Sequence, residues 1–269
     1  MSRRTLSTFV LFVFILALAA PALAQQSGTV YVRVELWDVK REQWPAFVKN
    51  FEKYDQPVYE KLFKEGVINE WGIDGATLHN PEGYTHGVWH SSTSMEAFEK
   101  VQDAFDAAYK ALGEKEQARV EAEFAGMLIK HRDYMIRQDF QKAKGVSLHK
   151  AYYYEASTAV NRGQEDNYVS YWNEYIKPTY QKLMDEGTIV AYGRSREEIT
   201  TDAEDRRTSW YVVGDLTAHQ KVQAALSQTW ERLTGEQQRA RWASIWEFAT
   251  PGTYREYMSR LVHWAIKEQ

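Results

Sequence analysis

Residues 54–72 read YDQPVYEKLFKEGVINEWG, and residues 175–193 read YIKPTYQKLMDEGTIVAYG. Nine of the nineteen positions are identical at a constant shift of 121 residues. An internal repeat of this length means that one structural unit is written twice in the chain. The shared pattern, Tyr-x-x-Pro-x-Tyr-x-Lys-Leu-x-x-Glu-Gly, is therefore the feature from which the fold is best inferred.

The first copy contains a clear order of predicted elements. Residues 30–39 alternate between apolar and polar side chains, which predicts a strand. A helix with apolar positions three or four apart follows up to Gly66, and Pro57 is expected to kink or break it. The remaining elements are predicted as strands near residues 67–73, 84–91 and 128–137, and a helical region over 94–126 with an interruption at Leu112-Gly113.

The second copy follows the same path, so each copy reads β-α-β-β-α-β, the ferredoxin-like unit. The predicted fold class is α+β, with two tandem ferredoxin-like repeats that form an intramolecular barrel. The expected boundaries are residues 28–140 for repeat 1 and 147–266 for repeat 2, with a linker between them.

Residues 1–24 have the features of a secretory signal peptide. Arg3 and Arg4 precede an uncharged apolar run, and Ala22-Leu23-Ala24 forms an Ala-x-Ala cleavage site. The run is shorter than the ~20 apolar residues that a bilayer requires, which disfavours a membrane anchor. We expect cleavage after Ala24, a secreted or periplasmic location, and no membrane association after cleavage.

The composition excludes several kinds of site. The chain contains no cysteine, which rules out disulfides, thiol catalysis and cysteine metal ligands. The leader holds two of the 33 basic residues and none of the 37 acidic ones, so the mature formal charge is 31 − 37 = −6. A mildly acidic chain without a basic stripe has no electrostatic footprint for nucleic acid. The expected partner is a small molecule, and a homo-oligomer is left open.

With these elements and this repeat, the chain resembles the dimeric α+β barrel superfamily. The resemblance rests most directly on the Tyr-x-x-Pro-x-Tyr-x-Lys-Leu-x-x-Glu-Gly pattern, which occurs in both copies. The resemblance implies two ferredoxin-like sheets that close a barrel, with helices outside. Members of that superfamily include cofactor-free monooxygenases, haem-degrading monooxygenases and chlorite dismutases, and the fold alone does not choose among them.

The lumen of such a barrel is the expected ligand site. If the apolar Val row of the first strand faces the helices, then Tyr31, Arg33 and Glu35 face inward. Arg33 is expected to hold an anionic or enolate oxygen. The alternative is a lumen that is filled by its own side chains. The candidate ligand-binding residues are Tyr31, Trp71, Tyr152, Tyr154 and Trp210.

Two histidines differ between the copies. His86 and His90 lie four residues apart on one strand, and Arg207 and Tyr211 stand at the matching positions. A specialised site in one half would use His86 or His90 to move a proton or to bind a metal or haem iron. Histidines without any role are the simpler interpretation.

Trp210 followed by His219 resembles part of the haem-degrading monooxygenase pattern. The resemblance implies that His219 binds iron and that Trp210 forms a wall against haem. That family also uses an Asn on the first strand, where this chain has Tyr152 and Tyr154. No cofactor is therefore expected, with haem as the alternative.

Three functions remain open at this point. The first is an exported small-molecule-binding barrel that acts as a cofactor-independent monooxygenase-like enzyme, with His86, His90 and Arg33 as catalytic residues. The second is a haem-binding or haem-degrading protein. The third is a non-catalytic structural or interaction module, in which the many Tyr and Trp side chains serve the core and subunit contacts.

Overall fold

The computed structural model describes residues 29–78, 83–199 and 205–268. The predicted signal peptide therefore lies outside the described residues. The first half consists of β1 (Val30–Val39), α2 (Trp44–Asn50), α3 (Gln56–Glu65), β2 (Glu70–Ala76), β3 (His86–Ser92), α4 (Glu96–Ala111), α5 (Glu114–Met127) and β4 (Leu128–Ala143). The second half consists of β5 (Val146–Leu148), β6 (Tyr152–Ala159), α6 (Glu165–Tyr171), α7 (Lys177–Asp185), β7 (Ile189–Ile199), β8 (Arg206–Val213), α8 (Leu216–Glu231), α9 (Gly235–Phe248) and β9 (Arg255–Ile266).

The strands form one closed antiparallel barrel. Each half has the ferredoxin-like strand order, β4-β1-β3-β2 in the first and β9-β6-β8-β7 in the second. Pairing of β4 with β7 and of β2 with β9 joins the halves and closes an eight-stranded barrel. The short β5 pairs with β9 outside this ring. The predicted α+β fold with two ferredoxin-like repeats is confirmed.

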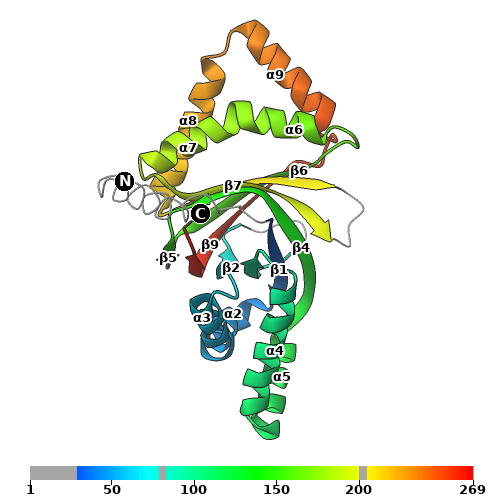
Figure 1. Cartoon of the computed structure of the whole chain (residues 1–269), viewed down its shortest axis with the longest axis vertical. Helices are drawn as coiled ribbons and strands as arrows, with labels where there is room; N and C mark the ends of the chain where they lie inside the picture. Colours follow the sequence, from blue (N-terminus) through cyan, green and yellow to red (C-terminus); the bar gives the residue numbers. More distant parts are fainter. Residues whose placement is uncertain (1–28, 79–82, 200–204, 269) are drawn as a thin grey trace, which may run out of the picture.

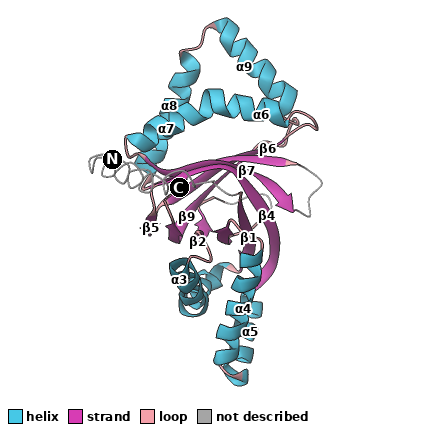
Figure 2. Ribbon diagram, in the orientation of Figure 1, coloured by secondary structure: helices cyan, strands magenta, loops and turns pink. Residues whose placement is uncertain are grey.

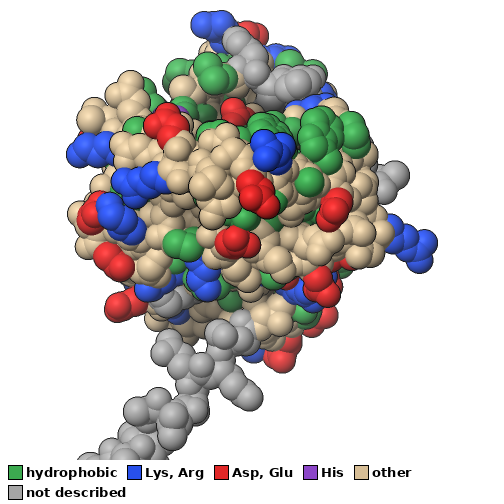
Figure 3. Space-filling model, turned by 90° about the horizontal axis from the view of Figure 1, so that it is seen from above, with side chains coloured by type: hydrophobic (Ala, Val, Ile, Leu, Met, Phe, Trp, Pro, Cys, Tyr) green, Lys and Arg blue, Asp and Glu red, His purple; other side chains and the backbone are tan. Residues whose placement is uncertain are grey.

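The helices cover the outside of the barrel in two groups. α2 to α5 lie on one side of it and α6 to α9 on the other (Figures 1 and 2). Seen from the α8–α9 side, basic and acidic side chains are interspersed over the surface (Figure 3). Among the described residues, no helix is long and apolar enough to cross a membrane.

The repeated proline has the same structural effect in both halves. Pro57 lies at the start of α3 and Pro178 at the start of α7. A five-residue π-helical segment precedes each helix, Phe51–Asp55 in one half and Trp172–Ile176 in the other. Because proline has no N–H and its ring crowds the preceding turn, the wider π turn lets the chain continue without a break. The predicted irregularity at Pro57 is thus a π segment.

The hydrophobic core lies mainly between the barrel and its helices. In the first half Phe47, Phe51 and Ile73 are buried there, and in the second half Trp172, Tyr192 and Tyr211 are. Gly66 and Gly187 end α3 and α7 with φ values of 79° and 80°, a left-handed conformation that glycine adopts without strain. The identical glycines of the repeat are thus explained by the fold.

Candidate functional site

The barrel turns the opposite row of β1 inward from the one expected. Val32, Val34 and Leu36 line the lumen, so the assignment of Tyr31, Arg33 and Glu35 to the lumen is wrong. Both faces of a barrel strand covered by helices are buried, so an apolar row does not identify the helix side. Here the Val row forms an apolar wall of the lumen.

The same inversion applies to β6. Tyr153, Glu155 and Ser157 line the lumen, whereas Tyr152 and Tyr154 pack with the core under the helices of the second half. The placement of Tyr152 and Tyr154 in the lumen is therefore corrected too. Since side chains alternate along a strand, a wrong choice of face moves every residue of the strand to the other side.

The predicted residues of the first half lie close together, but under the helices. Trp71 stacks on Tyr59 with ring centroids 6.0 Å apart, and the His90 ring lies 5.5 Å from Tyr59. His86 packs against Phe47 at 5.0 Å. Burial lowers the pKa of His86 to about 4 and that of His90 to about 3, so both rings are neutral at pH 7.

Arg33 lies on this outward face with its own partners. Its Nε is 3.3 Å from a Glu35 carboxylate oxygen, and its Nη2 is 3.4 Å from Asp133. Arg33 therefore does not line the cavity described below, and its predicted role in holding an oxyanion remains a prediction.

Trp210 and His219 lie on opposite faces of the second sheet. Trp210 lines the lumen, whereas the Tyr211 hydroxyl is 2.8 Å from His219 Nδ1 under α8. The expectation that Trp210 and His219 face one haem together is therefore wrong. Of the residues predicted to bind ligand, only Trp210 lines the lumen.

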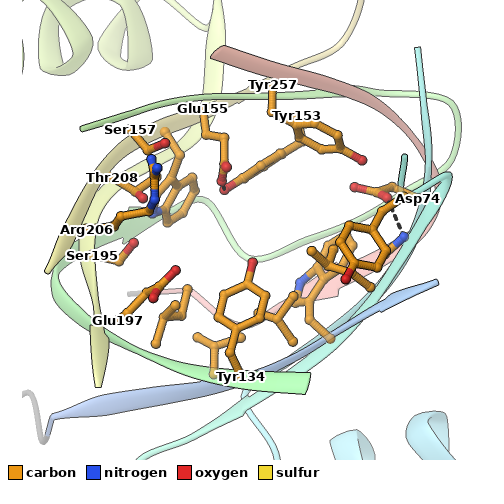
Figure 4. A pocket seen from close by; sticks show the side chains of 18 of the residues that line it. Asp74, Tyr134, Tyr153, Glu155, Ser157, Ser195, Glu197, Arg206, Thr208 and Tyr257 are labelled. Carbon is orange, nitrogen blue, oxygen red and sulfur yellow. Dashed lines mark hydrogen bonds between the residues drawn. The ribbon is translucent and has the colours of Figure 1, made fainter. Parts of the chain in front are cut away.

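The lumen holds a partly open cavity of about 550 Å³. Its wall is built from strands of both halves and carries aromatic, carboxyl and hydroxyl groups (Figure 4). The volume falls within the range of small-molecule sites in proteins. The lumen is thus neither wholly open nor wholly filled by its own side chains.

Asp74 on β2 is the most completely enclosed acid of this cavity. Gly87 N–H donates to Asp74 Oδ1 at 2.9 Å, and the Ser259 hydroxyl donates to Oδ2. A Cβ at Gly87 would lie 3.0 Å from Asp74 Oδ1, so the glycine makes room for the carboxyl group. Burial, assisted by the charge of Glu155, raises the pKa of Asp74 to about 7.

Glu155 on β6 brings a second carboxyl group into the cavity. The Tyr153 hydroxyl donates to Glu155 Oε2 at 2.7 Å. Burial is the main cause that raises the pKa of Glu155, and the negative charge of Glu197 adds to it. Asp74 and Glu155 come from different halves, so the closed barrel is what brings them to one cavity.

Tyrosines complete this part of the wall. Tyr134 and Tyr257 stand at matching positions of the two closing strands, and both line the cavity. Burial raises the pKa of both hydroxyls above the usual value, so they remain protonated at neutral pH. The Tyr134 hydroxyl points toward the middle of the cavity (Figure 4).

The basic residues of the lumen have protein partners. Arg132 lies 3.9 Å from Glu197 and over the Tyr134 ring at 5.0 Å. Arg206 donates to the Thr253 carbonyl at 3.1 Å. Figure 4 shows Arg206 on the opposite side of the cavity from Asp74. Arg206 therefore lies on the Glu155 side of the cavity and away from Asp74.

A tryptophan cluster fills the lumen at the level of Glu70. Trp89 Nε1 and Trp264 Nε1 donate to Glu70 Oε1 at 3.1 and 2.8 Å, and Gln141 donates to Oε2 at 3.2 Å. Asp74 is four residues further along β2, roughly 13 Å away at the usual strand rise. The indoles thus lie toward one end of the lumen, while the ionisable cavity extends toward the other.

The acids of the lumen are not duplicated. At the shift of 121 residues, Asp74 matches Ser195 and Glu155 matches Val34. The two copies therefore share their framework but not their chemistry. A comparison of the copies at the lumen positions could have indicated this site. Such a comparison indicates the site only when the face of each strand that lines the lumen is known.

Metal chemistry gains no support from the described part of the chain. Across residues 29–78, 83–199 and 205–268, no group of three or more His, Asp or Glu side chains could hold a metal ion. The donors in the lumen are carboxyl, hydroxyl and indole groups, which suit an organic ligand better.

Comparisons with known proteins agree with this architecture. No protein-family model and no curated protein sequence matches the chain. A proposed monooxygenase of Fusobacterium nucleatum is similar in structure, with a TM-score of 0.62, 9% identity, and coverage of 90% of this chain and 96% of that one. A proposed monooxygenase of Lactobacillus acidophilus gives a TM-score of 0.59, 6% identity, and coverage of 89% and 97%.

Mutant chlorite dismutase of Candidatus Nitrospira defluvii is also similar, with a TM-score of 0.47, 9% identity, and coverage of 86% of this chain and 91% of that one. The first two matches span nearly the whole of both chains, and the barrel closes within one polypeptide. The chain thus has the dimeric α+β barrel fold, with both halves of the barrel supplied by a single chain.

Proposed function

We propose that this protein binds a small organic molecule in the lumen of its barrel. The observation that carries the proposal is that Asp74 and Glu155, one from each half, line the same cavity of about 550 Å³. A barrel that served only as a structural module would fill this space with apolar side chains, because close packing stabilises a core.

The energetic argument points the same way. Taking a carboxyl group out of water is costly unless hydrogen bonds or charges compensate it. The raised pKa values of Asp74 and Glu155 show that the compensation from the protein is incomplete. Buried acids with raised pKa values beside a cavity are typical of functional sites.

Intrinsic fluorescence tests the proposal. Trp89, Trp210 and Trp264 line the lumen, so a ligand that enters it will change their emission. We expect saturable quenching of the mature chain by members of a panel of small aromatic acids, alcohols and amines. Ser157→Phe narrows the cavity and should abolish the response. Ser147→Phe places the same side chain on the exposed face of β5 and should leave it unchanged.

Monooxygenase-like chemistry without a cofactor is a second candidate. It is favoured by Asp74, whose pKa of about 7 suits a general base at neutral pH. Two structural neighbours are also named as proposed monooxygenases. The test is oxygen consumption with each lumen ligand found above. Consumption that is lost in Asp74→Asn supports an oxygenase, and binding without consumption supports a binding protein alone.

Haem is the alternative cofactor. The His90 ring is packed between Tyr59 and Phe98, whereas the hydrogen bond from Tyr211 engages only Nδ1 of His219 and leaves Nε2 as the nitrogen that could bind iron. A haemin titration tests this alternative. A Soret band at one haem per chain that disappears in His219→Ala would assign haem binding to the outer face of the second half.

Export and self-association are proposals of their own. The Ala-x-Ala site supports cleavage after Ala24, and mass spectrometry of the exported protein should then find Gln25 at the N-terminus. The oligomeric state is measured by light scattering during size-exclusion chromatography. A mass of twice the mature chain or more would support a homo-oligomer.

A further inference from the structure

We propose that the lumen ligand is an organic cation, an aromatic or alkyl amine whose ammonium group is held by Asp74 and Glu155. The inference rests on the proposed function and names the chemical class of its ligand. Its basis is geometric: two carboxyl groups share a cavity with the rings of Tyr134, Tyr153 and Tyr257.

The charge distribution in the cavity supports the binding of a cation near Asp74 and Glu155. Among the described residues, no ion pair links Asp74 or Glu155 to a basic side chain, although Arg206 lies near enough to Glu155 to favour its charged form. Arg132 is paired with Glu197 instead. A bound ammonium would supply the positive charge that Asp74 and Glu155 lack.

The hydrogen bonds around the acids leave room for a donor from the ligand. Glu155 accepts from Tyr153 through Oε2, and no other hydrogen bond from the described residues reaches its carboxyl group. A carboxylate has about four acceptor positions, and one protein donor uses only one of them. An ammonium group offers up to three N–H donors to such positions.

The tyrosine rings suit the same ligand. Their hydroxyls stay protonated, so the rings add no charge of their own. Each ring presents a negative face, and such faces attract a cation, most strongly where water is excluded. Aromatic faces and carboxylates together are a recognised way for proteins to bind amines.

The opposing interpretation makes a different prediction. If Asp74 and Glu155 act as neutral acids, they donate hydrogen bonds to a carbonyl or hydroxyl of a neutral ligand. Binding of that ligand would weaken as the pH rises and the carboxyl groups ionise. Binding of an amine would strengthen over the same range, because protons no longer compete with the ammonium for Asp74.

Three matched probes separate these cases by titration calorimetry of the mature protein. They are 2-phenylethylamine, 2-phenylethanol and 3-phenylpropanoate, which share a phenyl ring and differ in charge. We expect the amine to bind best, with an affinity that rises from about pH 6 to about pH 8 across the pKa of Asp74. Its binding should also release protons, which is seen as a dependence of the heat on the buffer.

Matched variants locate the ammonium group. Asp74→Asn and Glu155→Gln should each weaken the amine by about tenfold to a hundredfold, the value of one charged hydrogen bond. Asp133→Asn alters an acid on the outward face of the barrel that is paired with Arg33, and it should change the affinity little. Circular dichroism confirms that each variant is folded before binding is measured.

The outcomes are distinct. Tighter binding of the alcohol or the acid than of the amine overturns the amine inference and leaves the lumen as a binding site. Amine binding that is indifferent to both Asp74→Asn and Glu155→Gln overturns it as well. Failure of all three probes to bind up to their solubility limits overturns both the inference and the proposed function.

Discussion

The indole of Trp89 occupies the space beside Gly72 that a side chain would need. A Cβ at residue 72 would lie 2.4 Å from Trp89 Cζ2. The second half repeats the relationship, since a Cβ at Gly193 would lie 2.6 Å from Trp210 Cζ2. Both glycines belong to the repeated stretch, so their identity follows from a tryptophan on the neighbouring strand.

Replacement of either glycine by alanine should therefore destabilise the barrel. Overpacking of this kind costs about 1–3 kcal/mol, measured as the free energy of unfolding in urea. Gly193→Ala should cost more than Gly72→Ala, because its Cβ would also meet the Phe140 carbonyl at 2.6 Å, and backbone cannot rotate away. Gly126→Ala is the control, since nothing lies within 4 Å of that position in α5. Equal costs at all three positions would contradict the packing argument.

Glu70 should be required for stability as an acceptor and not as a charge. In Glu70→Ala, the indoles of Trp89 and Trp264 and the amide of Gln141 lose their partner inside the barrel. Each unpaired buried donor costs about 1–3 kcal/mol, so we expect a loss of at least ~3 kcal/mol in urea unfolding. Glu70→Gln keeps one acceptor oxygen for the two indoles and should cost much less. A similar loss in both variants would show that the charge matters.

Asp74 should make the protein less stable as the pH rises. Its pKa is about 7 in the folded state against 3.8 for an ordinary Asp. Between these values the folded state holds a proton that the unfolded state has released, so the contribution of Asp74 to stability is greatest below about pH 4 and falls up to about pH 7. The contribution of Asp74 alone is up to ~4 kcal/mol, at 1.36 kcal/mol per pKa unit.

Urea unfolding at several pH values measures this effect. Asp74→Asn should flatten the decline, because an amide does not ionise. Some decline should remain in the variant, since burial also raises the pKa of Asp55 to about 7. If the variant follows the same curve as the unsubstituted chain, Asp74 is not the group that titrates.

The fold could be predicted from the sequence because the same β-α-β-β-α-β pattern occurs twice. Two copies of a β-α-β-β-α-β unit have few ways to bury their sheets. Gly66 and Gly187 indicate the end of the corresponding helix in each copy. The extent of β4 was not foreseen. This strand runs on to Ala143 through residues that the sequence suggested as linker, because pairing with β7 of the other half supplies hydrogen bonds that no local pattern reveals.

The site was harder to predict because alternating side chains define two faces of a strand but do not show which face lines the lumen. Arg33 and Glu35 lie beneath helices, where their own ion pair satisfies them, while Val34 faces the lumen. The acids that matter most, Asp74 and Glu155, are 81 positions apart in sequence and line one cavity only after closure. A cavity that is assembled by closure of a barrel has no local signature in the sequence.

His90 should limit stability at acidic pH. Both of its ring nitrogens are buried without a hydrogen-bond partner among the described residues, and burial lowers its pKa to about 3 from 6.5. Below pH 6.5 the His90 side chain binds a proton in the unfolded state but not in the folded state. The free energy of unfolding therefore decreases as the pH is lowered. From pH 6.5 to about pH 4, His90 alone should cost up to ~3 kcal/mol. His90→Leu keeps an apolar side chain between Tyr59 and Phe98 and should reduce this acid dependence in urea unfolding, whereas His149→Leu, at an exposed position, should not. Some dependence should remain in His90→Leu, since burial also lowers the pKa of His86 to about 4. An unchanged acid slope in His90→Leu would mean that the ring finds water or a partner before the protein unfolds.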